Sequence, residues 1–199
     1  MAKVLILYQS SHGHMEQMAK AAVEGARAGG AQVTLKRVPE LMSEQEARKQ
    51  GMKWDQDAPW AKPQELPDYD AVILGIPTRY GRMVGPMAHF WDQTVEIWSS
   101  GKMVGKVGAV MSSTATQHGG QEMTQFSGIV NLLHFGMIIV GLPYAFTEQM
   151  TLDEIVGGSP YGASTITGSK GQRQPSEKDL AGARYQGKRV AEIAAKLAA

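Results

Sequence analysis

The apolar run at residues 4–8 leads directly into a small polar turn, and a helical pattern begins immediately after it. The turn reads Ser10-Ser11-His12-Gly13-His14-Met15. After the turn, apolar and small residues recur on one helical face between Met15 and Ala26. The first N–H groups of a helix lack intrahelical partners, and the helix dipole makes this end positive. The pattern therefore predicts a strand–turn–helix unit with an anion site at the start of the helix.

This turn differs from two common phosphate-binding loops. A Walker A loop needs Gly, four residues and then Gly-Lys-Ser or Gly-Lys-Thr, and the chain has no such string. The dinucleotide fingerprint needs two glycines one residue apart, and no pair among the 23 glycines has that spacing. A mononucleotide turn of the flavodoxin kind remains, with serine hydroxyls as neutral donors. An ordinary turn with N-cap residues is the alternative interpretation.

Composition excludes several classes of function. A net charge of +1, from 20 basic and 19 acidic residues, gives no electrostatic case for nucleic acid or a membrane surface. The chain has no cysteine, which excludes disulfides, thiolate catalysis and Cys-ligated metals, so redox chemistry would need a bound cofactor. No apolar stretch approaches the ~20 residues that span a bilayer, and no signal peptide is recognisable. We expect a cytoplasmic protein.

The alternation of apolar runs with helical patterns indicates the fold class. Five runs are typical of buried strands, at residues 4–7, 33–35, 71–74, 107–111 and 137–140. Helical patterns follow at residues 14–28, 86–97, 121–134 and 177–197, and a short helix is expected at 43–50. This order predicts an α/β, flavodoxin-like, doubly wound five-stranded parallel sheet with helices on both faces. Residues 1–199 are expected to form one domain.

A long segment at residues 141–176 interrupts this alternation. It is rich in glycine, and loops of such length in compact domains are usually functional or lie in interfaces. We expect it to be an insertion that splits the last strand, with residues 163–167 as the second half. It is also a candidate surface for association with another chain.

Ligands of open α/β sheets lie beyond the carboxyl ends of the strands. Besides the Ser10–Met15 turn, residues 75–81 and 112–120 follow strands there, and both segments contain glycine and hydroxyl side chains. Such loops bring backbone close to a flat ring, which suits flavin mononucleotide (FMN). Arg79 is a candidate to offset negative charge on the reduced flavin, although a solvated loop arginine is equally consistent with its spacing. His89 and His118 lack ligand spacing with carboxylates, so no metal site is expected.

Several strings carry a family resemblance along essentially the whole chain. They are Pro77-Thr78-Arg79-Tyr80-Gly81, Gly157-Gly158-Ser159-Pro160-Tyr161-Gly162-Ala163 and Arg173-Gln174-Pro175-Ser176, together with His134. With these strings the chain resembles the WrbA family of FMN-dependent NAD(P)H:quinone oxidoreductases. The resemblance implies a flavodoxin-like fold, FMN as cofactor and a homotetramer. It also implies two-electron, ping-pong hydride transfer from NADH or NADPH to quinones.

The resemblance assigns site residues by position. The FMN phosphate would bind Ser10, Ser11, His12, Gly13, His14 and Met15, and the isoalloxazine would bind Thr78, Arg79 and Tyr80. The loop between ring and ribityl would comprise Ser113, Thr114, Ala115, Thr116, Gln117, His118 and Gly119. His134, from the edge of a neighbouring subunit, would approach the flavin and is the candidate catalytic residue. Trp98 matches the aromatic wall of the substrate pocket, and His12 lies where the nicotinamide binds.

Two other functions remain open on the residues alone. One is a flavodoxin-type electron carrier, although such carriers are usually strongly acidic and this chain is nearly neutral. The other is a non-catalytic binding protein that uses a flavin fold to hold a partner. The choice between NADH and NADPH, and the quinone that is reduced, are left open by the sequence.

Overall fold

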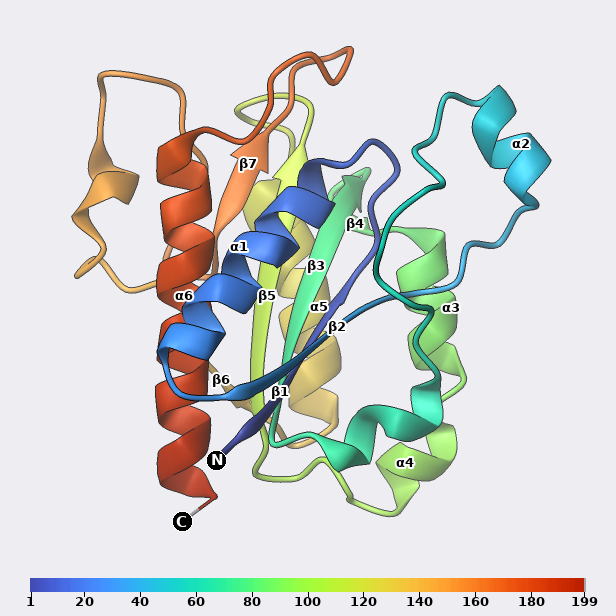
Figure 1. Cartoon of the computed structure of the whole chain (residues 1–199), viewed down its shortest axis with the longest axis vertical. Coiled ribbons are helices and arrows are strands. Elements are labelled where there is room, and N and C mark those ends of the chain that lie inside the picture. Colours follow the sequence, from blue (N-terminus) through green and yellow to red (C-terminus); the bar gives the residue numbers. More distant parts are fainter. Residues whose placement is uncertain (199) are drawn as a thin grey trace.

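The computed structural model describes residues 1–198, which form a central sheet with helices on both faces (Figure 1). The strands are β1 (Lys3–Tyr8), β2 (Gln32–Arg37), β3 (Ala71–Arg79), β4 (Arg82–Met83), β5 (Val107–Thr114), β6 (Ile138–Ile139) and β7 (Ser164–Ile166). The α-helices are α1 (His14–Ala28), α2 (Glu44–Lys49), α3 (Gly85–Asp92), α4 (Val95–Ser99), α5 (Gln121–His134) and α6 (Glu177–Leu197). Two 3₁₀ turns, η1 (Pro63–Asp68) and η2 (Thr147–Met150), lie in the connecting segments.

The sheet has the order β2-β1-β3-β5-β6, and all of these neighbours are parallel. The register pairs Ile6 of β1 with Ile73 of β3, and Ile73 with Ala109 of β5. All three strands therefore end at the same edge of the sheet, where the strand order also reverses. This is the edge at which ligands of open α/β sheets bind.

Side chains of alternate strand residues pack into two separate hydrophobic cores, one on each face of the sheet. Val4, Ile6 and Tyr8 of β1 face the core beneath α1 and α6. Leu5 and Leu7 face the core beneath α3, α4 and α5. Because both faces of the strand are covered, its sequence is continuously apolar rather than alternating.

The expected α/β flavodoxin-like class is confirmed, but the strand count of five is wrong. The sheet has seven strands, because β4 pairs antiparallel with the end of β3 and β7 pairs parallel with β5. The β4 strand has only two residues, so it has no recognisable apolar run. The predicted split of the last strand is confirmed, since β6 and β7 both pair with β5 and residues 140–163 run between them.

The single helix expected at residues 86–97 is two helices, α3 and α4. They are separated at Gln93 and Thr94. The buried Thr94 hydroxyl donates to the carbonyl of Trp91 at 2.6 Å, so that a local side-chain contact ends the first helix. The apolar pattern continues across the break, which is why the sequence suggested one helix.

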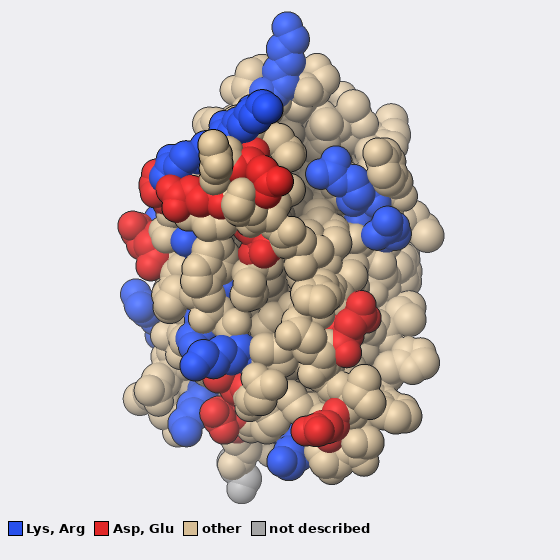
Figure 2. Space-filling view, turned by 90° about the vertical axis from the view of Figure 1, so that its right-hand side faces the viewer, with Lys and Arg blue, Asp and Glu red and all other residues tan. Residues whose placement is uncertain are grey.

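Charges on the face drawn in Figure 2 are mixed in sign. Basic and acidic side chains gather together at the upper left, and the lower part carries scattered charges on a broad uncharged surface. Arg48 of α2, for example, pairs with both Glu44 and Asp55. Among the described residues, no helix combines the length and the apolar character needed to cross a membrane.

Helices α1 and α6 pack closely because glycines occupy their contact. A Cβ atom at Gly25 of α1 would lie 1.9 Å from the carbonyl oxygen of Arg184 in α6. A Cβ at Gly187 of α6 would lie 2.3 Å from the carbonyl oxygen of Ala22 in α1. The two backbones therefore touch directly, and this contact fixes where α1 begins relative to the sheet.

We predict that Gly25→Ala destabilises the protein, although alanine is the better helix former. The added methyl group forces α1 and α6 apart, and such overpacking typically costs about 1–3 kcal/mol. The free energy of unfolding from urea titration measures the effect. Gly85→Ala is the matched control, because its Cβ would meet only Leu41 at an ordinary 3.6 Å. Equal stability of the two variants would contradict the prediction.

Candidate functional site

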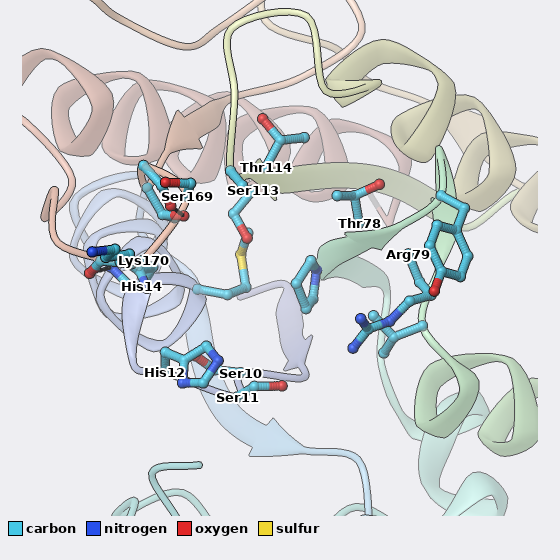
Figure 3. A pocket seen from close by; sticks show the side chains of 18 residues that line it. Ser10, Ser11, His12, His14, Thr78, Arg79, Ser113, Thr114, Ser169 and Lys170 are labelled. Carbon is cyan, nitrogen blue, oxygen red and sulfur yellow. Dashed lines mark hydrogen bonds between the residues drawn. The ribbon is translucent and has the colours of Figure 1, made fainter. Parts of the chain in front are cut away.

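A cavity of about 500 Å³ opens at the carboxyl edge of the sheet. Four chain segments surround it (Figure 3). Its lining consists of Ser10, Ser11, His12, His14, Met15, Pro77, Thr78, Arg79, Tyr80, Val84, Ser113, Thr114, Ala115, Thr167, Gly168, Ser169, Lys170 and Gly171. Three of the four segments are those that the sequence analysis identified after strands β1, β3 and β5.

The first segment is the turn between β1 and α1. The Gly13 amide donates to Ser10 Oγ at 3.0 Å, which leaves the Ser10 hydroxyl proton available. The backbone carbonyls of this turn are engaged by the segment after α2. Gln56 Nε2 donates to the Ser10 carbonyl at 2.9 Å, and the Lys53 amide donates to the Ser11 carbonyl at 2.7 Å. With these acceptors occupied, the donors of the turn remain available to the cavity.

The second segment is the tight hairpin between β3 and β4. Thr78 Oγ1 accepts hydrogen bonds from the Gly81 amide at 3.1 Å and from Thr124 Oγ1 at 2.7 Å. Its own proton is therefore free to donate. Tyr80 has a positive φ of 56° and its side chain is 91% exposed. A strained backbone that presents a bare aromatic ring at a cavity is typical of a functional site.

The third segment follows β5 and contributes only part of its length. Ser113, Thr114 and Ala115 line the cavity. After them the loop folds back on itself, because Gln121 Nε2 donates to the carbonyls of Thr116 and Gln117 at 3.2 and 2.8 Å. Of the predicted cofactor residues, the structure leaves six outside the lining of this cavity, namely Gly13, Thr116, Gln117, His118, Gly119 and His134.

The fourth segment, residues 167–171, was missed by the sequence analysis. It comes from the loop between β7 and α6 and places Ser169 and Lys170 at the cavity (Figure 3). His14 Nε2 contacts the Gly171 carbonyl at 3.0 Å, which joins this loop to the start of α1. A Cβ at Gly171 would lie 3.3 Å from His14 Cε1, so a larger residue would crowd the ring. The sequence did contain one clue: a strand was expected at residues 163–167, and the loop after such a strand would lie at the same edge of the sheet.

Asp179 of α6 anchors the fourth segment. Its buried carboxylate accepts from Thr165 Oγ1 at 2.8 Å and from Arg173 Nη1 at 3.0 Å. It also accepts from the amides of Gly157 and Ser176. One carboxylate thus ties β7, the insertion and the start of α6 together, and residues 167–171 are held between these fixed points.

The charges around the cavity favour an anionic ligand. Lys170 and Arg79 are both exposed and line opposite sides of it (Figure 3). None of the described residues that line it is Asp or Glu. Within residues 1–198, no cluster of His, Asp and Glu side chains could hold a metal ion. Hydroxyl donors, a helix start and Lys170 together fit the phosphate of a mononucleotide, and Arg79 adds a positive charge on the other side of the cavity.

His134 and Trp98 lie away from this cavity. His134 ends α5 and Trp98 lies in α4, both at the opposite end of the sheet (Figure 1). The two are adjacent to each other, because Trp98 Nε1 donates to the His134 carbonyl at 2.9 Å. Both side chains are exposed. Within one chain, therefore, neither reaches the cavity.

Comparison with known proteins identifies the family. The profile of the NADPH-dependent FMN reductase family matches residues 2–151. This chain belongs to that family. A protein of Acidovorax ebreus named NAD(P)H dehydrogenase (quinone) is 60% identical over 197 residues, covering 99% of this chain and 98% of the relative. A protein of Rhizobium rhizogenes with the same name is 59% identical over 199 residues, covering 100% of both chains.

A solved structure supports the fold of this FMN reductase family member. A flavodoxin, WrbA-like protein from Agrobacterium tumefaciens superposes with a TM-score of 0.69. It is 24% identical and the match covers 98% of this chain and 99% of the other. The flavodoxin-like fold inferred from the sequence is therefore confirmed. The expected resemblance to NAD(P)H:quinone oxidoreductases agrees with the full-length relatives named NAD(P)H dehydrogenase (quinone).

The buried His14 predicts a pH dependence of stability. Burial, with the nearby His12, holds the His14 pKa below its ordinary value of 6.5. As pH falls through 6.5 the unfolded chain takes up a proton that the folded protein does not, so stability is full above this pH and falls below it. His14→Asn should therefore lose less unfolding free energy than the wild type between about pH 7 and pH 5.

Urea titration at several pH values measures this difference. His118→Asn is the matched control, because it makes the same replacement at an exposed histidine. A pH dependence of His14→Asn identical to that of the wild type would show that His14 is not the group responsible.

Proposed function

We propose that the protein is an FMN-dependent NAD(P)H:quinone oxidoreductase. The observation that carries this proposal is the cavity, whose donors and cations fit a flavin mononucleotide at the sheet edge. Membership of the NADPH-dependent FMN reductase family and the full-length relatives named NAD(P)H dehydrogenase (quinone) support the same function. We further propose that both substrates use this one cavity in turn.

The residues that would hold FMN follow from the donor set. Ser10, Ser11 and the start of α1 would bind the phosphate, and Lys170 would add a positive charge that the turn itself lacks. Thr78, with its free hydroxyl proton, would bind a polar edge of the ring. FMN, when bound, supplies the two-electron redox chemistry that a chain without cysteine cannot supply.

The chain's own groups would stabilise charge and position the substrates. Arg79, on the opposite side of the cavity from the phosphate end, would offset negative charge on the reduced ring. Tyr80 and His12 are both exposed at the cavity, where flat rings of nicotinamide or quinone could stack on them. No side-chain nucleophile is needed in this scheme.

Rapid mixing of the FMN-loaded protein with NADH tests the proposed function. We expect direct and fast loss of visible flavin absorbance, because nicotinamide reduces the bound flavin without another protein. Mixing with benzoquinone should then restore the absorbance. A flavodoxin-type carrier would need a separate reductase, and a non-catalytic binding protein would show neither change. Either of these results would overturn the proposal.

We also propose that the protein assembles as a homotetramer in which His134 and Trp98 reach the cavity of a neighbouring copy. Both lie at the opposite end of the sheet from the cavity of their own chain, so they would have to act between subunits. Exposed apolar residues support such contacts on α4 and α5 and in the insertion: Val95, Val130, Leu133, Tyr144, Met150, Leu152 and Ile155.

His134→Ala is predicted to lower quinone turnover while FMN stays bound. If the imidazole donates to a developing negative charge, its removal should cost about 100-fold in turnover. Steady-state kinetics at full flavin occupancy measure this effect, and His89→Ala is a control on a histidine outside the proposed machinery. Because the contact is proposed between subunits, turnover should also fall when dilution dissociates the assembly. Unchanged turnover of His134→Ala would remove the histidine from the mechanism.

A further inference from the structure

A side-chain network behind the cavity connects a glutamate to the phosphate end of the site. Gln9 Nε2 donates to Glu40 Oε1 at 2.7 Å and to Ser11 Oγ at 3.2 Å. Ser11 lines the cavity, whereas Gln9 is 2% exposed and Glu40 is partly buried. Two side chains, Gln9 and Ser11, therefore connect Glu40 to the ligand position.

The sheet register brings these residues together. Residues of β1 and β2 pair up to Tyr8 and Arg37, and the Val38 amide still donates to the Tyr8 carbonyl at 2.9 Å. The two strands thus leave the sheet side by side. Gln9 and Glu40, which are 31 residues apart in sequence, meet directly beyond their ends.

Both side chains retain a buried oxygen atom without a partner. Neither Gln9 Oε1 nor Glu40 Oε2 accepts a hydrogen bond from any group within residues 1–198. A carboxylic acid and an amide can pair so that each donates once and accepts once. A single proton on Glu40 Oε2 would give both oxygen atoms a partner in such a pair.

We propose that Glu40 is a positioning residue for the cofactor phosphate, which it controls through Gln9 and Ser11. This inference rests on the proposed FMN site. Glu40 takes one hydrogen of the Gln9 amide, so the other hydrogen goes to Ser11 Oγ. Because Ser11 Oγ is then an acceptor toward Gln9, its own proton points to the phosphate. Phosphate binding favours the neutral form of Glu40, which completes the acid–amide pair and removes a negative charge from behind the anion.

The surroundings of Glu40 agree with this assignment. Burial raises the pKa of Glu40, against the opposing effects of the Gln9 hydrogen bond and the positive charge of Arg37. Arg37 is itself engaged elsewhere, because its guanidinium lies 3.7 Å from the Trp60 ring centre and donates to the carbonyls of Trp54 and Ala58. On α1, the Glu16 carboxylate is paired with Lys20 and Lys53.

The test compares FMN dissociation constants of wild type and Glu40→Gln over a range of pH, by quenching of flavin fluorescence. Wild-type affinity should fall as pH rises through the Glu40 pKa, above its usual value of 4.5. Glu40→Gln, a permanently neutral analogue, should lose this component, while titration of the FMN phosphate is common to both proteins. Identical pH profiles would overturn the proposal. Glu192→Gln, which removes an exposed charge on α6, should behave as wild type.

A second comparison tests the route through Ser11. Ser11→Ala should weaken FMN binding about tenfold or more, because a hydrogen bond to a charged phosphate is lost. At a pH below the Glu40 pKa, where Glu40 is neutral, Glu40→Ala should weaken FMN binding in the wild-type background. It should not weaken binding in the Ser11→Ala background, because the two residues act in one path. Additive effects would contradict the relay, as would an unchanged affinity of Ser11→Ala.

Riboflavin lacks the phosphate, so its binding tests whether Glu40 acts at the phosphate end of the site. Its affinity should be the same for wild type and Glu40→Gln at every pH. An equal change in riboflavin and FMN binding would overturn the assignment to the phosphate. Failure of the wild type to bind FMN at all would instead refute the proposed function, so the two failures are distinguishable.

Discussion

The parallel register of β1, β3 and β5 is the constraint on which the site depends. Because these strands are paired without a shift, their carboxyl ends and the turns that follow them lie together at one edge. The same register extends into β2 and brings Glu40 beside Gln9. A one-residue slip would reverse the face of every strand side chain and would separate these turns. The cavity is therefore a consequence of backbone pairing before any ligand is considered.

The rest of the cavity depends on contacts that are remote in sequence. Asp179 holds β7, the insertion and the start of α6, and this arrangement carries Lys170 to the phosphate end. His14 closes the wall by bonding to Gly171. The insertion is thus tied, through the Gly157 amide, to the carboxylate that fixes the fourth segment.

Few charged side chains line the cavity. The turn after β1 supplies neutral donors, and only Lys170 and Arg79 bring full positive charge to the lining. A neutral glutamate behind the turn would suit a phosphate better than a charged one, which is the basis of the inference about Glu40. Charged groups elsewhere form mixed pairs, such as Arg48 with Glu44 and Asp55.

Local sequence patterns were sufficient for the fold class, the three turns at the sheet edge and the split last strand. Apolar runs and glycine spacing reflect backbone geometry, which each segment largely dictates on its own. The break at Thr94, the strand β4 and the place of Lys170 could not be read in this way. A threonine hydroxyl decides the first, hairpin pairing with the end of β3 decides the second, and packing with distant segments decides the third. Likewise, only the tertiary structure separated His134 and Trp98 from the cavity of their own chain, because distance in space is set by packing and not by position along the chain.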